Sequence, residues 1–88
     1  MIDMKAVGLR ILVARRQQGL RQGEVAKLAG ISARHMSQIE TGKRPGVQAV
    51  TMAKIAQVLH VSVDYLLGLT KAEDWEQEER TTTENAGQ

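Results

Sequence analysis

Apolar residues along the first 70 positions recur at intervals of three and four, which is the spacing that one face of an α-helix requires. No stretch alternates apolar and polar residues in the way that a half-buried β-strand does. The spacing is interrupted where a glycine can end a helix, at Gly19, Gly30, Gly42 and Gly68. The pattern therefore predicts several short helices that pack together without a sheet.

Five helices are expected, in a compact all-α domain. Ser32 and Ser62 each precede a periodic stretch, and a serine hydroxyl in that place accepts a free backbone N–H of the first turn. The expected helices cover about 4–18, 22–29, 33–41, 48–59 and 63–67. Their apolar faces form the predicted core, which comprises Val7, Ile11, Ala14, Val25, Leu28, Ala29, Met36, Ile39, Met52, Ile55, Ala56, Leu59, Val63, Leu66 and Leu67.

The size and the residue types limit what this chain can do. Its 88 residues are close to the lower limit for one domain with its own core. The sequence contains no cysteine, and His35 and His60 stand far apart with no carboxylates at ligand spacing, so we expect no metal and no other cofactor. No signal peptide or membrane-spanning run is present, and we expect a cytoplasmic, nucleoid-associated protein without a membrane partner.

The net charge of +2 divides unequally along the chain. Residues 1–70 contain ten Lys and Arg against four Asp and Glu, whereas residues 71–88 contain two against six. A basic body indicates a polyanionic partner, although an ordinary solvated surface would have the same composition.

The end of the chain differs from the rest in composition. Thr70 and Glu73 have the capping-box spacing that starts a helix, and mostly charged residues follow up to Arg80. The polar residues 81–88 are expected to be disordered. The sequence therefore predicts a domain over 1–69 and an acidic extension over 70–88, which is helical at first and then disordered.

The second and third expected helices have the features of a helix-turn-helix unit. Ala26 is small enough for the two helices to approach closely, and Gly30 can adopt the positive φ that the turn requires. With Met36 and Ile39 buried, the opposite side of the third helix carries Arg34, Ser37, Gln38 and Thr41. An α-helix fits the major groove of B-DNA, and these side chains can bond to base edges there.

These residues resemble the helix-turn-helix domain of the Cro and phage-repressor proteins, the xenobiotic-response-element regulator family. The resemblance spans roughly residues 5–69. Matching residues are Gly19-Leu20, Gln22, Glu24-Val25-Ala26, Leu28-Ala29-Gly30-Ile31-Ser32, Met36-Ser37-Gln38-Ile39-Glu40, Gly42, Lys54-Ile55-Ala56, Leu59, Val61-Ser62 and Asp64-Tyr65-Leu66-Leu67-Gly68.

The resemblance implies a bacterial, archaeal or phage transcription factor that binds double-stranded, pseudo-palindromic DNA as a dimer. The positions that match the base-reading residues of the family are Ala33, Arg34, Ser37 and Gln38. Those that match its phosphate-binding residues are Gln22, His35, Lys43 and Arg44. The resemblance further implies a structural ion pair that bridges the first and third helices, Arg15 with Glu40.

The sequence departs from the family pattern in four places. Arg21 stands where a Ser or Thr N-cap is usual, which weakens the start of the second helix by roughly 1 kcal/mol. Gly23 lowers helix propensity in the first turn. The loop at Pro45-Gly46 is one residue longer than usual, and Ala33 has only a methyl group to offer a base.

We expect a sequence-specific DNA-binding transcriptional regulator, a repressor that binds a palindromic operator as a homodimer. Alternatives are the antitoxin of a toxin–antitoxin pair, a restriction–modification controller, and a protein-interaction adaptor that reuses the fold. An enzyme is not expected, because the Ser, His and Asp residues form no recognisable nucleophile arrangement and no Gly-rich phosphate loop is present.

Two apolar surfaces extend beyond the predicted core. One lies on the first helix, where it either widens the buried stripe or contacts a protein partner, and consists of Leu9, Leu12 and Val13. The other lies near the end of the fold, where we expect homodimerisation, and consists of Val58, Leu69 and Trp75. The C-terminal tail is a further place where a protein partner could bind.

Overall fold

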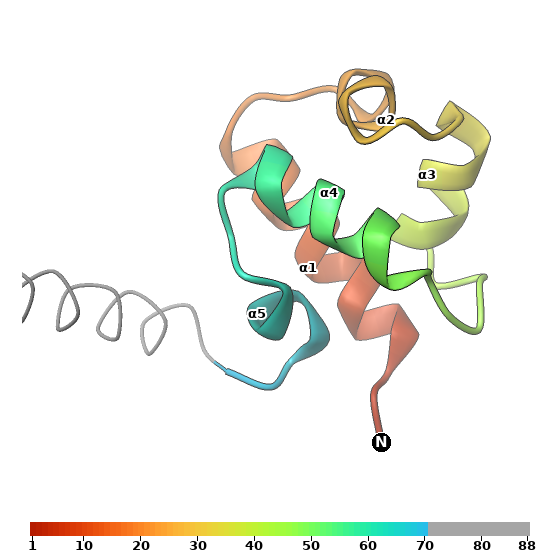
Figure 1. The fold of residues 1–88 in the computed structure, drawn as a ribbon, viewed down its shortest axis with the longest axis vertical. Helices are drawn as coiled ribbons and strands as arrows, with labels where there is room; N and C mark the ends of the chain where they lie inside the picture. Colours follow the sequence, from red (N-terminus) through yellow and green to blue (C-terminus); the bar gives the residue numbers. More distant parts are fainter. Residues whose placement is uncertain (71–88) are drawn as a thin grey trace, which may run out of the picture.

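The structure, a computed structural model, describes residues 1–70. Every regular element in this range is a helix, which confirms the predicted all-α fold: α1 (Met4–Gln17), α2 (Gln22–Ala29), α3 (Ala33–Glu40), α4 (Ala49–Leu59) and α5 (Val63–Leu67). The predicted extension lies outside the described residues except for Thr70, and so does Trp75. In Figure 1, α4 crosses in front of α1. Helix α2 lies at the top of the view, α3 at the right and α5 at the lower left.

The helices begin and end within one residue of the predicted positions because local signals fix both ends. The Ser32 Oγ accepts the backbone N–H of His35 at 3.0 Å, and the Ser62 Oγ accepts that of Tyr65 at 2.9 Å. No cap from the Arg21 side chain is present, as expected; instead a Glu24 carboxylate oxygen accepts the Arg21 backbone N–H at 2.9 Å. The start of α2 is therefore stabilised from inside the helix.

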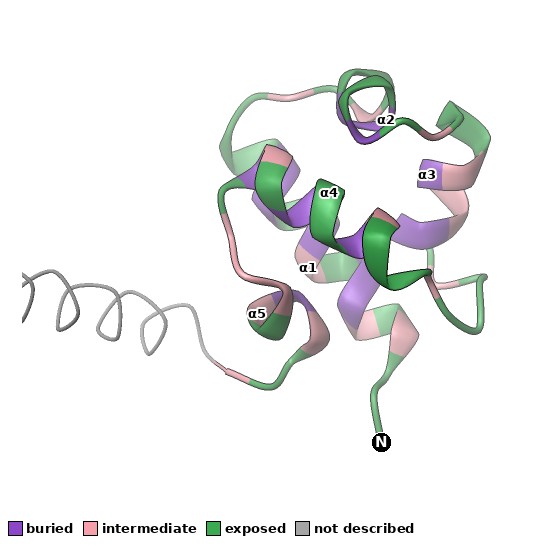
Figure 2. Ribbon diagram, viewed as in Figure 1, coloured by how far each residue is buried: buried purple, intermediate pink, exposed green. Residues whose placement is uncertain are grey.

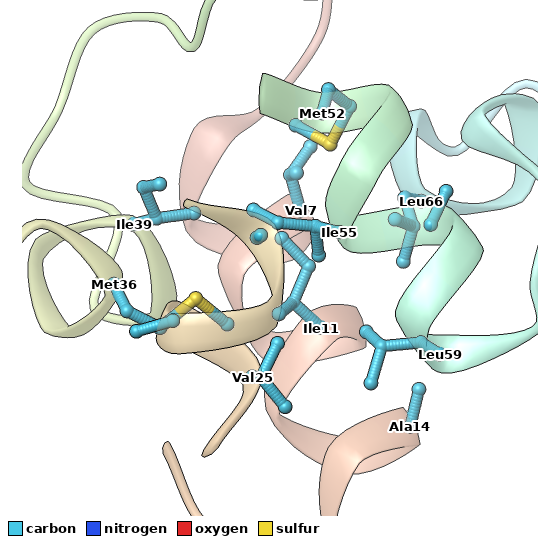
Figure 3. Close-up of a cluster of buried hydrophobic side chains, with 13 residues drawn as sticks. Val7, Ile11, Ala14, Val25, Met36, Ile39, Met52, Ile55, Leu59 and Leu66 are labelled. Carbon is cyan, nitrogen blue, oxygen red and sulfur yellow. The ribbon is translucent and has the colours of Figure 1, made fainter. Parts of the chain in front are cut away.

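One core joins all five helices (Figure 3). Helix α2 packs against α3 and α4, and α1 packs against α3, α4 and α5. The apolar side chains meet between these helices, and the outward faces stay exposed, as Figure 2 shows. The buried apolar residues are Val7, Ile11, Ala14, Val25, Ala26, Ala29, Met36, Ile39, Met52, Ile55, Ala56, Leu59 and Leu66.

The prediction that Leu28 belongs to the core is wrong, because 67% of its surface is exposed. Val25 and Ala29 lie one turn apart and share the buried side of α2 with Ala26. At 100° per residue, Leu28 falls well to one side of the centre of this face. Two further predicted core residues, Val63 and Leu67, are only partly buried and pack at the margin of the core.

Helices α1 and α3 approach each other at Gly8. This glycine is buried in the middle of α1, and a Cβ atom built on it would lie 2.4 Å from the Ile39 carbonyl oxygen and 2.5 Å from that of Glu40. Such distances leave no space for any side chain, so the absence of a Cβ sets how closely the two backbones pack. The contact fixes the last turn of α3 against α1.

Candidate nucleic-acid interface

Helices α2 and α3 form a helix-turn-helix unit around Gly30. Gly30 adopts φ 73°, ψ 30°, a left-handed conformation that costs a glycine little. The backbone N–H of Ile31 then donates to the Ala26 carbonyl oxygen at 2.9 Å, closing the end of α2. Ile31 is partly buried and packs against the core. The turn thus directs α3 across α2, with its side opposite the core facing outward.

The outward side of α3 carries the residues that the resemblance assigns to base reading. Ala33 and Arg34 are exposed, and Ser37 and Gln38 are partly exposed, whereas Met36 and Ile39 anchor the inner side in the core. The guanidinium of Arg34 makes no hydrogen bond or ion pair to another residue in the range 1–70. Its donors therefore remain available to an external acceptor.

Gln38 is linked to the loop that follows α3. The Arg44 Nε donates to the Gln38 Oε1 at 3.0 Å, and both side chains lie near solvent. A glutamine that binds adenine at two points uses its carbonyl oxygen as an acceptor and its amide nitrogen as a donor. The bond from Arg44 uses one of the two lone pairs of this oxygen and orients the Gln38 amide, whose nitrogen remains free to donate to a base. Gln38 lies on α3 and Arg44 lies six positions later in the loop, so their spacing in the sequence does not predict this hydrogen bond.

The end of α3 brings basic side chains next to its outward face. The Lys43 backbone N–H donates to the Gln38 carbonyl oxygen at 3.0 Å, and the Thr41 Oγ1 donates to the Ser37 carbonyl oxygen at 2.9 Å. These bonds turn the chain sharply, and Lys43 and Arg44 are both exposed beyond the turn. His35, the predicted phosphate-binding residue that lies on α3 itself, is in the first turn of the helix and is partly exposed.

The predicted partners Arg15 and Glu40 lie in contact inside the protein. Their bidentate contact joins Arg15 Nε to Glu40 Oε2 at 2.7 Å and Arg15 Nη2 to Glu40 Oε1 at 3.0 Å. Only 9% of Arg15 and 5% of Glu40 is exposed. The Arg15 Nη1 also donates to the Leu20 carbonyl oxygen at 2.9 Å. The pair thereby connects α1, the loop before α2 and the end of α3.

Glu40 raises the pKa of the Arg15 guanidinium above its ordinary value, mainly through the hydrogen bond and also through charge attraction, while burial acts in the opposite direction. A group with a raised pKa contributes stability that is lost only as the pH rises through that pKa. Because arginine already titrates at strongly alkaline pH, the Arg15 charge persists throughout the neutral range.

Gln22 also belongs to this buried network. Its Nε2 donates to the Glu40 Oε1 at 3.0 Å, so the side chain predicted to bind phosphate is turned toward the ion pair. The backbone N–H groups in the first turn of α2 remain directed outward along the helix axis, as in any α-helix. Sequence reasoning missed this contact because Gln22 and Glu40 are 18 positions apart and only the fold brings them together.

No group of three or more His, Asp or Glu side chains within residues 1–70 could hold a metal ion. None of the described helices combines the length and apolar character that crossing a bilayer requires.

Comparison with known proteins identifies relatives over the same region. A family model described as a helix-turn-helix domain matches residues 6–69. An HTH-type transcriptional regulator of Sinorhizobium fredii, y4mF, is 35% identical over 60 residues, which cover 68% of this chain and 78% of that protein.

Two solved structures have a similar fold. The restriction–modification controller protein C.AhdI from Aeromonas hydrophila superposes with a TM-score of 0.68 at 30% identity, and covers 73% of this chain and 96% of its own. The P22 c2 repressor in complex with a synthetic operator gives a TM-score of 0.67 at 28% identity, with the same coverage of 73% and 96%.

Proposed function

This chain belongs to the family of helix-turn-helix domains and is a DNA-binding transcriptional regulator, and we propose on that premise that it is a repressor that binds a palindromic operator as a homodimer. Membership of this family confirms the resemblance predicted from the sequence and agrees with the prediction that the chain is not an enzyme. The observation that carries the proposal is the outward face of α3, where Arg34 is exposed and has no partner among the described residues.

In the proposed complex, α3 enters the major groove. Arg34 bonds a guanine at two points, Ser37 and the Gln38 amide nitrogen bond neighbouring base edges, and the Ala33 methyl group contacts a thymine methyl. Each good bidentate contact contributes about 1–3 kcal/mol of discrimination between bases. Since Arg34 lies in the first turn of α3, it belongs to the end of a recognition helix that reaches deepest into the groove.

Phosphate contacts on both sides of α3 would fix its position without reading sequence. Lys43 and Arg44 supply them from the loop after α3, and His35 supplies one from its first turn. Gln22 supplies one from the first turn of α2. Its side chain also bonds Glu40, and the backbone N–H groups of the same turn bind the phosphate together with it. The other exposed Lys and Arg side chains of the basic body add long-range attraction.

A two-fold dimer would place two copies of α3 about 34 Å apart, which is one turn of B-DNA. Occupation of such a site over a promoter blocks transcription. Selection of bound sequences from a random duplex pool tests the proposal. We expect an inverted repeat with half-site centres about one helical turn apart, protected by two chains. Recovery of sequences without a shared motif would contradict it, and a single half-site bound by one chain would contradict the homodimer.

A restriction–modification controller is the second candidate, and the likeness to C.AhdI favours it. Such a regulator would bind upstream of genes for a restriction endonuclease and a DNA methyltransferase. Mapping of the selected operator onto the source genome distinguishes this role from repression of unrelated genes.

A further inference from the structure

Helix α1 exposes apolar side chains on the side opposite the core. We call this surface the α1 patch, and it consists of Leu9, Leu12 and Val13. Leu9 is 58% exposed, Val13 is 39% exposed and Leu12 is partly exposed, so these residues do not widen the buried stripe, which was one of the two expectations from sequence. Residues three and four positions apart are neighbours on a helix surface, and Leu9 therefore adjoins both Leu12 and Val13.

The α1 patch is bounded by positive charge. Lys5 lies one turn before Leu9, and Arg16 lies one turn after Leu12 and Val13, on the same side of the helix. Both are exposed, and neither makes an ion pair with a carboxylate within residues 1–70. An occupant of this surface therefore needs an apolar group at its centre and negative charge around it.

The described part of the chain ends beside α1. Arg10 on α1 donates from Nη1 to the Leu66 carbonyl oxygen at 3.2 Å, which joins α5 to α1 next to the patch. Gly68, Leu69 and Arg10 help to line an open hollow of about 360 Å³ between the end of α5 and the start of α1. Arg10 precedes Val13 by one turn of α1, so the last described residues lie beside the flank of α1 that adjoins Val13.

The composition of residues 71–88 matches what the patch needs. This segment contains six Asp and Glu against two Lys and Arg, and Trp75 is its only large apolar residue. Trp75 is six positions beyond Leu69, and six extended residues reach about 20 Å. Because this length exceeds the α1 diameter of about 10–12 Å, the segment is long enough for Trp75 to reach the patch.

The area of the patch also favours this occupant over a second copy of the chain. The three aliphatic side chains present an apolar surface on the order of 200 Å², whereas each partner in a stable dimer buries about 800 Å². A tryptophan side chain buries about 150–250 Å², which is the area that the patch offers.

We propose that the acidic C-terminal segment of this chain docks on the α1 patch, with Trp75 on Leu9 and Val13 and its carboxylates near Lys5 and Arg16. The contact covers an apolar surface that would otherwise face water, and it keeps the negative charges of the segment next to α1. A protein partner that uses α1 must first displace the segment. The inference does not depend on DNA binding.

Trp75 is the only tryptophan of the chain, so the fluorescence of the full-length protein reports on it alone. We expect its emission at shorter wavelength than that of a free peptide of residues 70–88, and lower accessibility to acrylamide. Leu9→Ser should remove most of this shift, whereas Leu28→Ser, which alters an apolar residue on α2 with 67% exposure, should leave it unchanged. Circular dichroism checks that both variants keep their helices.

Three results would overturn the docking. The first is a wild-type emission equal to that of the free peptide. The second is an equal loss of the shift in Leu9→Ser and Leu28→Ser. The third is a shift that appears only as the protein associates, with sedimentation measured on the same samples, because the occupant would then be a second copy. A shift that stays the same over concentrations at which sedimentation shows the dimer dissociating into monomers supports it.

Discussion

Arg15 on α1 and Glu40 at the end of α3 form a nearly buried ion pair with two hydrogen bonds of 2.7 and 3.0 Å. Gln22 from the start of α2 adds a third bond to the same carboxylate, at 3.0 Å. The last residue of α3 is thereby connected to both helices that support it. The network positions the recognition helix without contributing a side chain to its outward face.

Removal of Glu40 should destabilise the fold strongly. Glu40→Ala leaves the Arg15 guanidinium buried without its partner, and we expect a loss of about 3–5 kcal/mol in the free energy of unfolding, measured by urea denaturation. The double variant Arg15→Met, Glu40→Leu is the control and should lose much less, because no charge remains unpaired. A loss of only about 0–1 kcal/mol in Glu40→Ala, which is typical of exposed pairs, would contradict this role.

Gly8 and Gly23 should respond to alanine in opposite directions. Gly8→Ala forces a Cβ atom against the backbone of α3, and we expect a loss of about 1–3 kcal/mol in spite of better helix propensity. A Cβ at Gly23 meets no atom within 4 Å, so Gly23→Ala should gain about 0.5–1 kcal/mol. Thermal unfolding of both variants measures the difference, and a stabilised Gly8→Ala would show that α1 and α3 do not approach closely.

Arg34→Ala should relax the base preference at one position in each half-site and weaken specific binding by about 1–3 kcal/mol. The cause is the loss of a two-point contact to guanine, since the exposed Arg34 supports no other described residue. Anisotropy titrations against a set of operator variants test this. Unchanged preference at every position would contradict base reading by Arg34.

Lys43→Ala should weaken binding to all sequences alike, because Lys43 lies in the loop after α3 and is expected to contact only phosphate. The slope of log affinity against log salt should fall by about 1. Titrations of operator and random DNA over a range of salt concentrations provide both values. A slope equal to that of the unaltered protein would argue against a phosphate contact at this position.

Arg44→Lys should change the base preference at the position that Gln38 reads. The lysine keeps the positive charge but lacks the planar guanidinium whose Nε bonds the Gln38 Oε1, so it no longer holds the Gln38 amide in one orientation and the amide can turn to bind adenine at two points. We expect enrichment of adenine in site selection, while affinity for random DNA stays close to that of the unaltered protein. An identical selected motif would mean that the Arg44 bond does not set the orientation of Gln38.

The sequence alone determined the helices and the outward face of α3. Helix ends depend on residues that are close in the chain, such as Ser32 with His35, and a glycine with positive φ at residue 30 marks the turn. The 3.6-residue period then assigns Met36 and Ile39 to the core and Arg34 to the surface. The ion pair of Arg15 with Glu40 was also anticipated, but only through the family resemblance.

Only the tertiary structure decided which distant groups meet. The bond from the Gln22 side chain to Glu40, the exposure of Leu28 and the contact of Gly8 with α3 all depend on how the helices pack. The hydrogen bond from Arg44 to Gln38 depends on the path of a loop that carries no periodic signal. Periodicity and capping are local properties of the chain, whereas the angle and distance between helices result from the balance of all core contacts, which no single stretch of sequence contains.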